Sequence, residues 1–339
     1  MRVLLLIVGL VAGAAFVFFA RAEGDRVLWL QAWLVAVLFW LGPALGGLLL
    51  LIVQRISAGK GALPAAAPLA ALTATLPMSL LAFVPLGFGL SVLLPWVIPA
   101  PDLAGLAAQR APWMTAPLLL VRTGAIFVVW LGLAWWAIRG PMPPRAAVAA
   151  LVVALITLLL FLVDWVLGLT PRWSTELFPL VLAVGLGLTA PTLLALSGAP
   201  GAFGLARWLC GGVLLLLYLL FLQYLVVWTG NLPDQVTWYL AREGGPWPDL
   251  GIAAFCLLGI AGAAGLVWPR LLAGAGTAVL GWVLLIGEAL LVVWMILPAF
   301  APVKPSTYWL TGLAMLSLGG LWGLMYYNVG GVRPRGEAA

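Results

Sequence analysis

The sequence lacks histidine altogether and has few cysteines and few charged residues. Among its 339 residues there is no histidine, there are two cysteines, and 8% of residues are charged. Because b-type haem and most zinc sites need imidazole ligands, the missing histidine argues against both in this chain. Cys210 and Cys256 both lie inside apolar runs, so neither a disulfide framework nor a cysteine metal site is expected.

Apolar sequence takes the place of the missing charge. Hydrophobic residues make up 65% of the chain and the mean hydropathy is +1.19, whereas a soluble domain carries about 25% charged residues. The chain is therefore predicted to be an all-α polytopic membrane protein in contact with the lipid bilayer. Its net charge of +6 comes from single basic residues scattered between apolar runs, which argues against nucleic acid as a partner.

Ten apolar runs are each long enough to cross about 30 Å of hydrocarbon. The predicted spans cover residues 3–20, 30–53, 70–94, 114–138, 146–167, 177–197, 208–228, 250–267, 277–300 and 309–329. The first run also matches a signal peptide with cleavage near Ala20–Ala22, but we favour a retained helix. In the third run, Pro77 and Pro85 predict kinks, because proline removes helix hydrogen bonds.

The long joining segments suggest how the spans are grouped. Residues 95–113 and 229–249 follow the third and the seventh span, which indicates a repeat of four spans. We therefore predict one membrane domain over residues 1–339, with a first four-helix bundle in 30–168 and a second in 177–300. Two flanking helices, 3–20 and 309–329, complete this arrangement. In the second span, Gly42 and Gly46 predict close approach of a neighbouring backbone.

Basic residues are distributed unequally between the two sides of the membrane. The side of the chain ends carries nine Lys and Arg residues, and the opposite side carries six. Because basic loops stay in the cytoplasm, both termini are predicted to be cytoplasmic, in a bacterial inner membrane.

Two of the three ionisable residues inside predicted spans are expected to pair with each other. Arg122 lies two turns inside the fourth span, and Asp164 lies near the far end of the fifth. A charge at the centre of a span costs about 2.5–3.5 kcal/mol on insertion scales, so such residues usually face the protein interior and find partners. We predict a buried ion pair, either structural or part of a proton path.

The third ionisable residue, Glu288, lies near the middle of the ninth span and has only apolar neighbours on its own helix. Tyr218 of the seventh span is predicted at the same depth as its hydrogen-bond partner, with Thr189 or Thr192 extending the line. Because desolvation disfavours a carboxylate, we expect a largely neutral acid. It would serve either as a proton relay or as a structural link between helices.

The segment after the seventh span is polar and rich in aromatic residues. Trp228 is placed at the headgroup level, and residues 229–249 are predicted to form an amphipathic cover along the interface. A quinone slot needs an apolar opening, aromatic walls and proton-exchanging groups. The candidates for its outer end are Asp164, Trp165, Trp173, Gln223 and Tyr224. The alternative is an aromatic belt with satisfied polar ends.

Several stretches together resemble one known family. Gln223-Tyr224-x-x-x-Trp228-x-Gly-Asn-Leu-Pro followed by Trp238-Tyr239 is similar to the ActF-type membrane subunit of alternative complex III, a member of the NrfD-like quinone-interacting proteins. Further landmarks in the family's order are residues 38–47, 94–96, 111–130, 164–165 and 171–175. Where the family commonly has histidine, this chain has Gln54-Arg55, Arg172 and Ala241.

The resemblance implies a fold of two four-helix bundles and a subunit of a respiratory, quinol-oxidising complex. Redox centres would then lie on iron–sulfur, c-haem and NrfD-like partner subunits, with a quinone as the possible ligand. The chain itself would supply a proton path through Glu288, Asp164, Arg122 and Tyr218. The alternative is a structural or assembly protein that has kept the fold but lost the quinone chemistry. A transporter is the third alternative.

Overall fold

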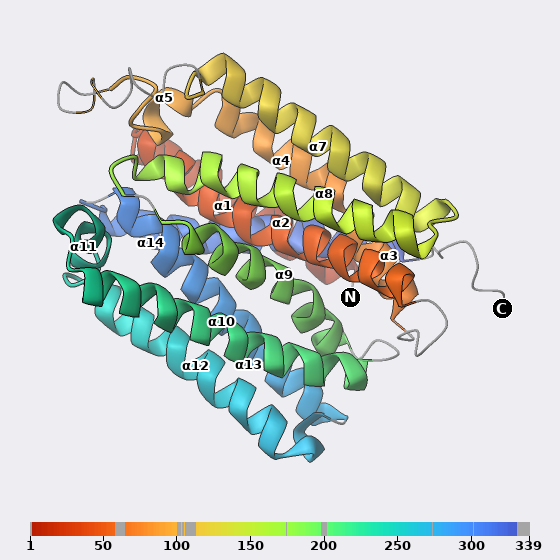
Figure 1. Cartoon of the computed structure of the whole chain (residues 1–339). Helices are drawn as coiled ribbons and strands as arrows, with labels where there is room; N and C mark the ends of the chain where they lie inside the picture. Colours follow the sequence, from red (N-terminus) through yellow and green to blue (C-terminus); the bar gives the residue numbers. More distant parts are fainter. Residues whose placement is uncertain are drawn as a thin grey trace.

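The computed structural model describes residues 2–57, 65–99, 103, 105, 113–173, 175–197, 202–272, 274–300 and 302–330. In this part of the chain all regular structure is helical (Figure 1). Most of the predicted joining segment 95–113 lies outside these ranges. So do six of the charges counted for topology, namely Lys60, Asp102, Arg110, Arg333, Arg335 and Glu337.

Ten helical segments are long and apolar enough to span a membrane, which confirms the predicted fold class. Nine of the segments end within four residues of the predicted bounds at both ends. The helices are α1 (Arg2–Ala22), α2 (Arg26–Ile56), α3 (Ala66–Thr73), α4 (Leu76–Gly87), α5 (Leu90–Leu93), α7 (Ala116–Arg139), α8 (Pro144–Trp165), α9 (Leu177–Ser197), α10 (Ala202–Gly230), α11 (Pro233–Leu240), α12 (Trp247–Val267), α13 (Ala275–Ile296) and α14 (Pro305–Val329).

The third span is broken, as its prolines predict. Pro77 stands in the first turn of α4, directly after the break that separates α3 from α4. Pro85 lies near the end of α4, and a second break at residues 88–89 precedes α5. Proline is tolerated in a first turn because the N–H it lacks has no helical partner there.

Helix α2 runs through the middle of the molecule and is the most buried span (Figure 1). It packs against α9 and α14 and also against α3, α4 and α8. Its contact with α9 is close because glycines face that helix. A Cβ built on Gly42 would lie 2.7 Å from the carbonyl oxygen of Leu186, and one on Gly46 would lie 2.8 Å from the Cβ of Ala190. The predicted close approach at these glycines is confirmed.

The remaining spans pack against α2 or against its neighbours. Helices α9, α10, α12 and α13 pack against one another in a ring, α7 packs on α8, and α1 packs mainly on α14. Since α2 contacts both α8 and α9, these contacts do not divide the chain cleanly, and the two-bundle grouping stays a prediction.

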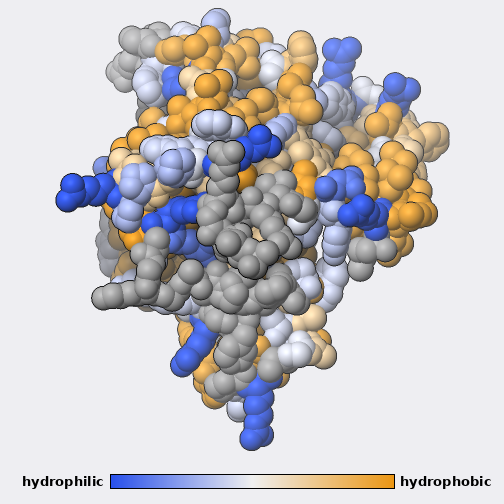
Figure 2. Space-filling view, turned by 90° about the vertical axis from the view of Figure 1, so that its right-hand side faces the viewer, coloured by the Kyte–Doolittle hydropathy of each residue, from blue (hydrophilic) through white to orange (hydrophobic). Residues whose placement is uncertain are grey.

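Helix α1 begins and α14 ends at the same end of the helix stack, where Arg2 donates to the Tyr327 carbonyl, and α5 and α11 lie at the opposite end (Figure 1). Figure 2 looks onto the end with the termini and shows hydrophilic side chains there beside hydrophobic surface. Within the predicted interfacial segment 229–249, the short helix α11 follows α10 and precedes α12, and its Trp238 is buried; the position of this segment at a membrane interface stays a prediction.

Candidate functional site

Arg122 and Asp164 form a two-pronged ion pair between the adjacent helices α7 and α8. The Nε of Arg122 lies 2.5 Å from Oδ2 of Asp164, and its Nη2 lies 2.7 Å from Oδ1. The side chains are 11% and 6% exposed. This geometry confirms the predicted buried pair, and the planar guanidinium matches the carboxylate fork.

The surroundings of this pair complete its hydrogen bonding. The Arg122 guanidinium lies 4.1 Å from the centre of the Trp113 ring and also donates to the Trp113 carbonyl. Next to Asp164 on α8, the indole of Trp165 donates to the hydroxyl of Thr123, at 3.0 Å. Trp165 packs edge-on against Phe83, so this region is a packed core with its charges satisfied.

Glu288 on α13 is 2% exposed and has one hydrogen-bond partner among the described residues. Its Oε1 lies 2.7 Å from the hydroxyl of Thr192 on α9, while its Oε2 has no partner in that part of the chain. Among the described residues, no basic nitrogen lies within 4.0 Å of the Glu288 carboxyl oxygens, so Glu288 forms no ion pair with them. The arrangement differs from that of Asp164, whose two oxygens are both bonded.

Close helix packing creates the Glu288 arrangement. A Cβ built on Gly281 of α13 would lie 3.0 Å from the backbone nitrogen of Leu196 on α9, so the two helices almost touch there. Glu288 lies seven residues after Gly281, and Thr192 lies four residues before Leu196, so both fall on the same facing stripes of two antiparallel helices. Side chains at these positions therefore meet.

The hydroxyl of Thr192 lies between two acceptors. It is 2.9 Å from the carbonyl oxygen of Leu188 and 2.7 Å from Oε1 of Glu288, and a hydroxyl has a single proton to donate. If Glu288 is protonated, it donates to Thr192, which donates to Leu188, and the chain of bonds is complete. If Glu288 is ionised, the bond to Leu188 is lost. The geometry favours the protonated acid.

An apolar cavity of about 490 Å³ begins one helical turn from this pair, on the side of the chain ends. Its wall includes Leu285, three residues before Glu288, and Leu193, next to Thr192. Ser197 and Tyr326 supply hydroxyl groups farther along the cavity. The cavity is thus lined by residues of the same two helices, α9 and α13, that carry Thr192 and Glu288.

Tyr218 is not the partner of Glu288, so that prediction is wrong. Its side chain is 55% exposed, on the outer surface of α10. The buried stripe of α10 runs through Leu209, Val213, Leu216 and Leu220, and Tyr218 falls on another face. Thr192, predicted only as an extension of the line, is the residue that contacts the acid.

The candidate quinone-facing residues do not gather around one opening. Trp165 is 1% exposed in the α7–α8 core described above. The indole of Trp173 donates to the Gln235 carbonyl and stacks on Trp238, while Tyr224, half exposed, meets Tyr239 edge-on. Buried Gln223 accepts a hydrogen bond from the Thr175 hydroxyl at 2.8 Å. These contacts agree better with packed aromatic ends than with an open slot.

Arg242 is a structural feature that sequence reasoning missed. It is 5% exposed, and its guanidinium lies 3.2 Å from the ring centre of Trp238. It donates to the carbonyls of Trp294 at 3.1 Å and Met295 at 2.7 Å, in the last turn of α13, and to the Trp238 carbonyl. A cation is favoured at a helix carboxyl end, where carbonyls lack helical partners. Burial lowers the pKa of Arg242 and raises that of neighbouring Tyr239.

The fold defines a multi-pass helical membrane protein. No protein-family model matches the chain, and no curated protein matches it. In the described ranges, no three His, Cys, Asp or Glu side chains gather into a group that could hold a metal ion.

Proposed function

We propose that this chain is an integral membrane subunit of a quinol-oxidising electron-transfer complex and that Glu288 is its proton-exchanging group. The proposal joins the resemblance to ActF-type subunits with the arrangement around Glu288. The redox centres would lie on iron–sulfur, c-haem and NrfD-like partner subunits, and the chain would sit in a bacterial inner membrane with cytoplasmic termini.

The observation that carries the proposal is the buried, half-satisfied carboxyl of Glu288. A buried group that is needed only for packing is normally fully hydrogen-bonded. Here Oε2 lacks a partner among the described residues, and Oε1 shares the single hydroxyl proton of Thr192 with a carbonyl. Ionisable groups at membrane depth commonly mark proton relays, because few other roles offset their cost.

The cavity beside Leu285 supports a route for the proton. It brings the hydroxyl groups of Ser197 and Tyr326 to the side of the chain ends, which the charge distribution predicts to be cytoplasmic. Under this proposal, a proton from this side reaches Glu288 past Leu285 and Leu193, which line the cavity. The Arg122–Asp164 pair has both partners satisfied, so we assign it a supporting role in helix packing.

Glu288→Gln in the assembled complex tests the proposal, because glutamine keeps the shape and the hydrogen bonding but cannot exchange a proton. We expect fewer protons translocated per electron, with subunit assembly retained. Translocation equal to that of the parent would contradict the relay. Co-purification of iron–sulfur and c-haem subunits with the wild-type chain tests the membership in such a complex.

A structural or assembly role is the second candidate, and one observation favours it. Trp165 and Trp173, two of the residues proposed for a quinone site, have their indole N–H groups bonded within the protein and are 1% and 3% exposed. Under this reading Glu288 only links α9 to α13. Loss of assembly without the chain, combined with full proton translocation by the Glu288→Gln complex, would establish this role.

A further inference from the structure

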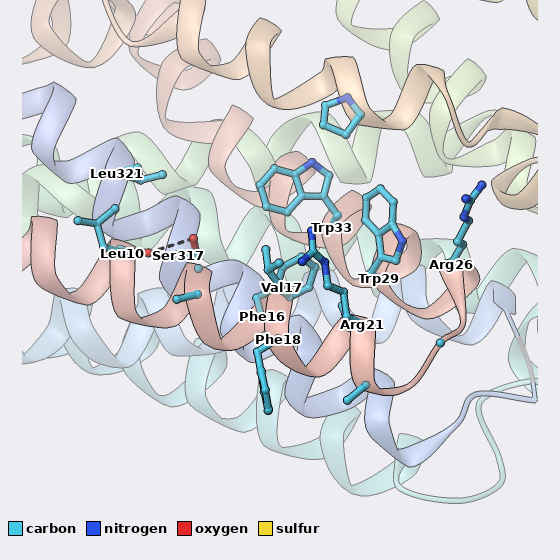
Figure 3. A pocket seen from close by; sticks show the side chains of 17 residues that line it. Leu10, Phe16, Val17, Phe18, Arg21, Arg26, Trp29, Trp33, Ser317 and Leu321 are labelled. Atoms are coloured by element: carbon cyan, nitrogen blue, oxygen red, sulfur yellow. Dashed lines mark hydrogen bonds between the residues drawn. The ribbon is translucent and has the colours of Figure 1, made fainter.

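A broad groove lies along α1 on the surface of the molecule (Figure 3). It has a volume of about 1500 Å³, larger than the roughly 300–1000 Å³ of ordinary small-molecule sites. Gly9, Gly13 and Ala14 of α1 are among the residues that line it, together with Ser317 of α14, whose hydroxyl donates to the Gly9 carbonyl at 3.2 Å. A Cβ built on Gly9 would lie 3.0 Å from the backbone nitrogen of Leu321, so these small residues let α14 pack closely on α1 beside the groove.

Aromatic and aliphatic side chains form the walls of the groove. Val17 and Phe18 of α1 are 48% and 67% exposed, and α1 is the least buried of the ten spans. Trp29 and Trp33 of α2 face α1 across the groove (Figure 3). Tryptophan concentrates at the membrane–water interface, so these two mark the level where hydrocarbon gives way to headgroups.

Two arginines stand at the same end of the groove. Arg21, from the last turn of α1, extends toward Trp29 and Trp33, and Arg26 begins α2 (Figure 3). Neither lies within 4.0 Å of a carboxylate of the described residues. Asp25, between them in sequence, is bound to Lys304 at 3.0 Å. Two cations without acidic partners thus lie where a lipid phosphate would lie.

We propose that this groove binds an anionic phospholipid, with its acyl chains along α1 and its phosphate held by Arg21 and Arg26. Charge complementarity selects the anionic headgroup, because guanidinium groups bind phosphate by paired hydrogen bonds. Each basic residue near the headgroups favours anionic lipid, and the volume exceeds that of an ordinary small-molecule site. This site does not depend on the function proposed above.

The test is lipid binding to the purified full chain, read by native mass spectrometry. Phosphatidylglycerol and phosphatidylcholine with identical acyl chains are titrated separately. The wild type should prefer phosphatidylglycerol, and Arg21→Gln/Arg26→Gln should weaken its binding by roughly ten- to thirtyfold while leaving phosphatidylcholine unchanged. The control Arg139→Gln/Arg145→Gln removes two exposed charges, one at the end of α7 and one in the first turn of α8, and should retain the preference.

Filling the groove tests where the acyl chains lie. Ala14→Trp should reduce binding of both lipids, whereas Val11→Trp, on the same exposed helix but outside the groove, should not. Equal binding of the two lipids by the wild type, or an unchanged preference in the Arg21→Gln/Arg26→Gln variant, would overturn the proposal. A photoreactive side chain at Val17 that in native membranes attaches to a protein rather than to lipid would also overturn it.

Discussion

Among the described residues, the two buried acids, Asp164 and Glu288, differ in how their carboxyl oxygens are hydrogen-bonded. Asp164 receives two hydrogen bonds from Arg122, and that pair lies between adjacent helices of the first half of the chain. Glu288 has one bond to Thr192 and a second oxygen without a partner among the described residues. A carboxylate that is fully paired is stable as an ion, whereas one without a cation is stable as a neutral acid.

Protonation would therefore have opposite effects on the hydrogen bonding of the two acids. Protonating Asp164 would break the pair and leave Arg122 as an uncompensated charge. Protonating Glu288 instead completes the chain of hydrogen bonds through Thr192 to Leu188. The hydrogen bonding therefore favours a paired ion at Asp164 and a neutral acid at Glu288, and proton exchange by Glu288 is our proposal. This contrast predicts different effects for substitutions at the two acids and at the other buried or paired charges.

The largest effect is expected from breaking the ion pair. Asp164→Leu should lower the free energy of unfolding by about 3–5 kcal/mol, because it leaves a buried, unpaired arginine. The measurement is reversible unfolding of the purified chain in mixed micelles. The double variant Arg122→Met/Asp164→Leu removes both charges and should recover most of the loss. A double variant as unstable as the single one would contradict this account.

Arg242 is a buried cation that has no acidic partner among the described residues. Arg242 is compensated by three backbone carbonyls, so Arg242→Met should cost about 2–3 kcal/mol, the value of charged hydrogen bonds left unmade. Arg242→Lys should recover little, because an ammonium group lacks the planar fork. Limited proteolysis between α11 and α12 should increase in both variants. Wild-type stability of Arg242→Lys would show that charge alone is sufficient.

Removing the single partner of Glu288 is expected to cost less. Thr192→Val keeps the shape but not the hydroxyl, and it should lower the free energy of unfolding by about 0.5–1.5 kcal/mol. Glu288→Gln should change stability less than Thr192→Val, because an amide can donate to Thr192 as a protonated acid does. A loss of several kcal/mol in Glu288→Gln would indicate that the carboxylate form is the stable one.

The smallest effect on stability is expected from breaking the exposed ion pair between Lys304 and Asp25. Hydrogen bonds from Lys304 and from the backbone N–H of Val27 lower the pKa of Asp25. The stability that these contacts give to the folded state is therefore present at neutral pH and is lost as the pH falls below about 4. Asp25→Asn should cost under about 1 kcal/mol at pH 7, since the Lys304 side chain is 59% exposed. The difference from wild type should vanish in acid and shrink in high salt. A difference that persists in acid would point to helix capping instead.

The sequence was sufficient where residue type alone determines the outcome. Apolar length defines the ten spans, Gly42 and Gly46 define a close helix crossing, and two opposite charges in neighbouring spans predict the Arg122–Asp164 pair. Each of these three predictions depends only on the type of residue at a few positions in the sequence.

It was insufficient where the outcome depends on the rotation of a helix. Helix α10 is apolar on every side, so its sequence carries little signal of which face is buried, and Tyr218 was assigned to the wrong face. Arg242 lies one helical turn after Trp238 in the sequence, a spacing that permits the stacking seen in the structure but does not require it. The carbonyls it binds belong to α13, more than fifty residues away, and no local pattern reveals them.

The protonation of Glu288 in the purified chain is the most direct test of the central claim. Infrared spectroscopy at neutral pH, in H₂O and in D₂O, detects a protonated carboxyl by its carbonyl band and the isotope shift of that band. We predict such a band in the wild type and in Arg122→Met/Asp164→Leu, and its loss in Glu288→Gln. A wild type without the band, or a band that persists in Glu288→Gln, would contradict the account.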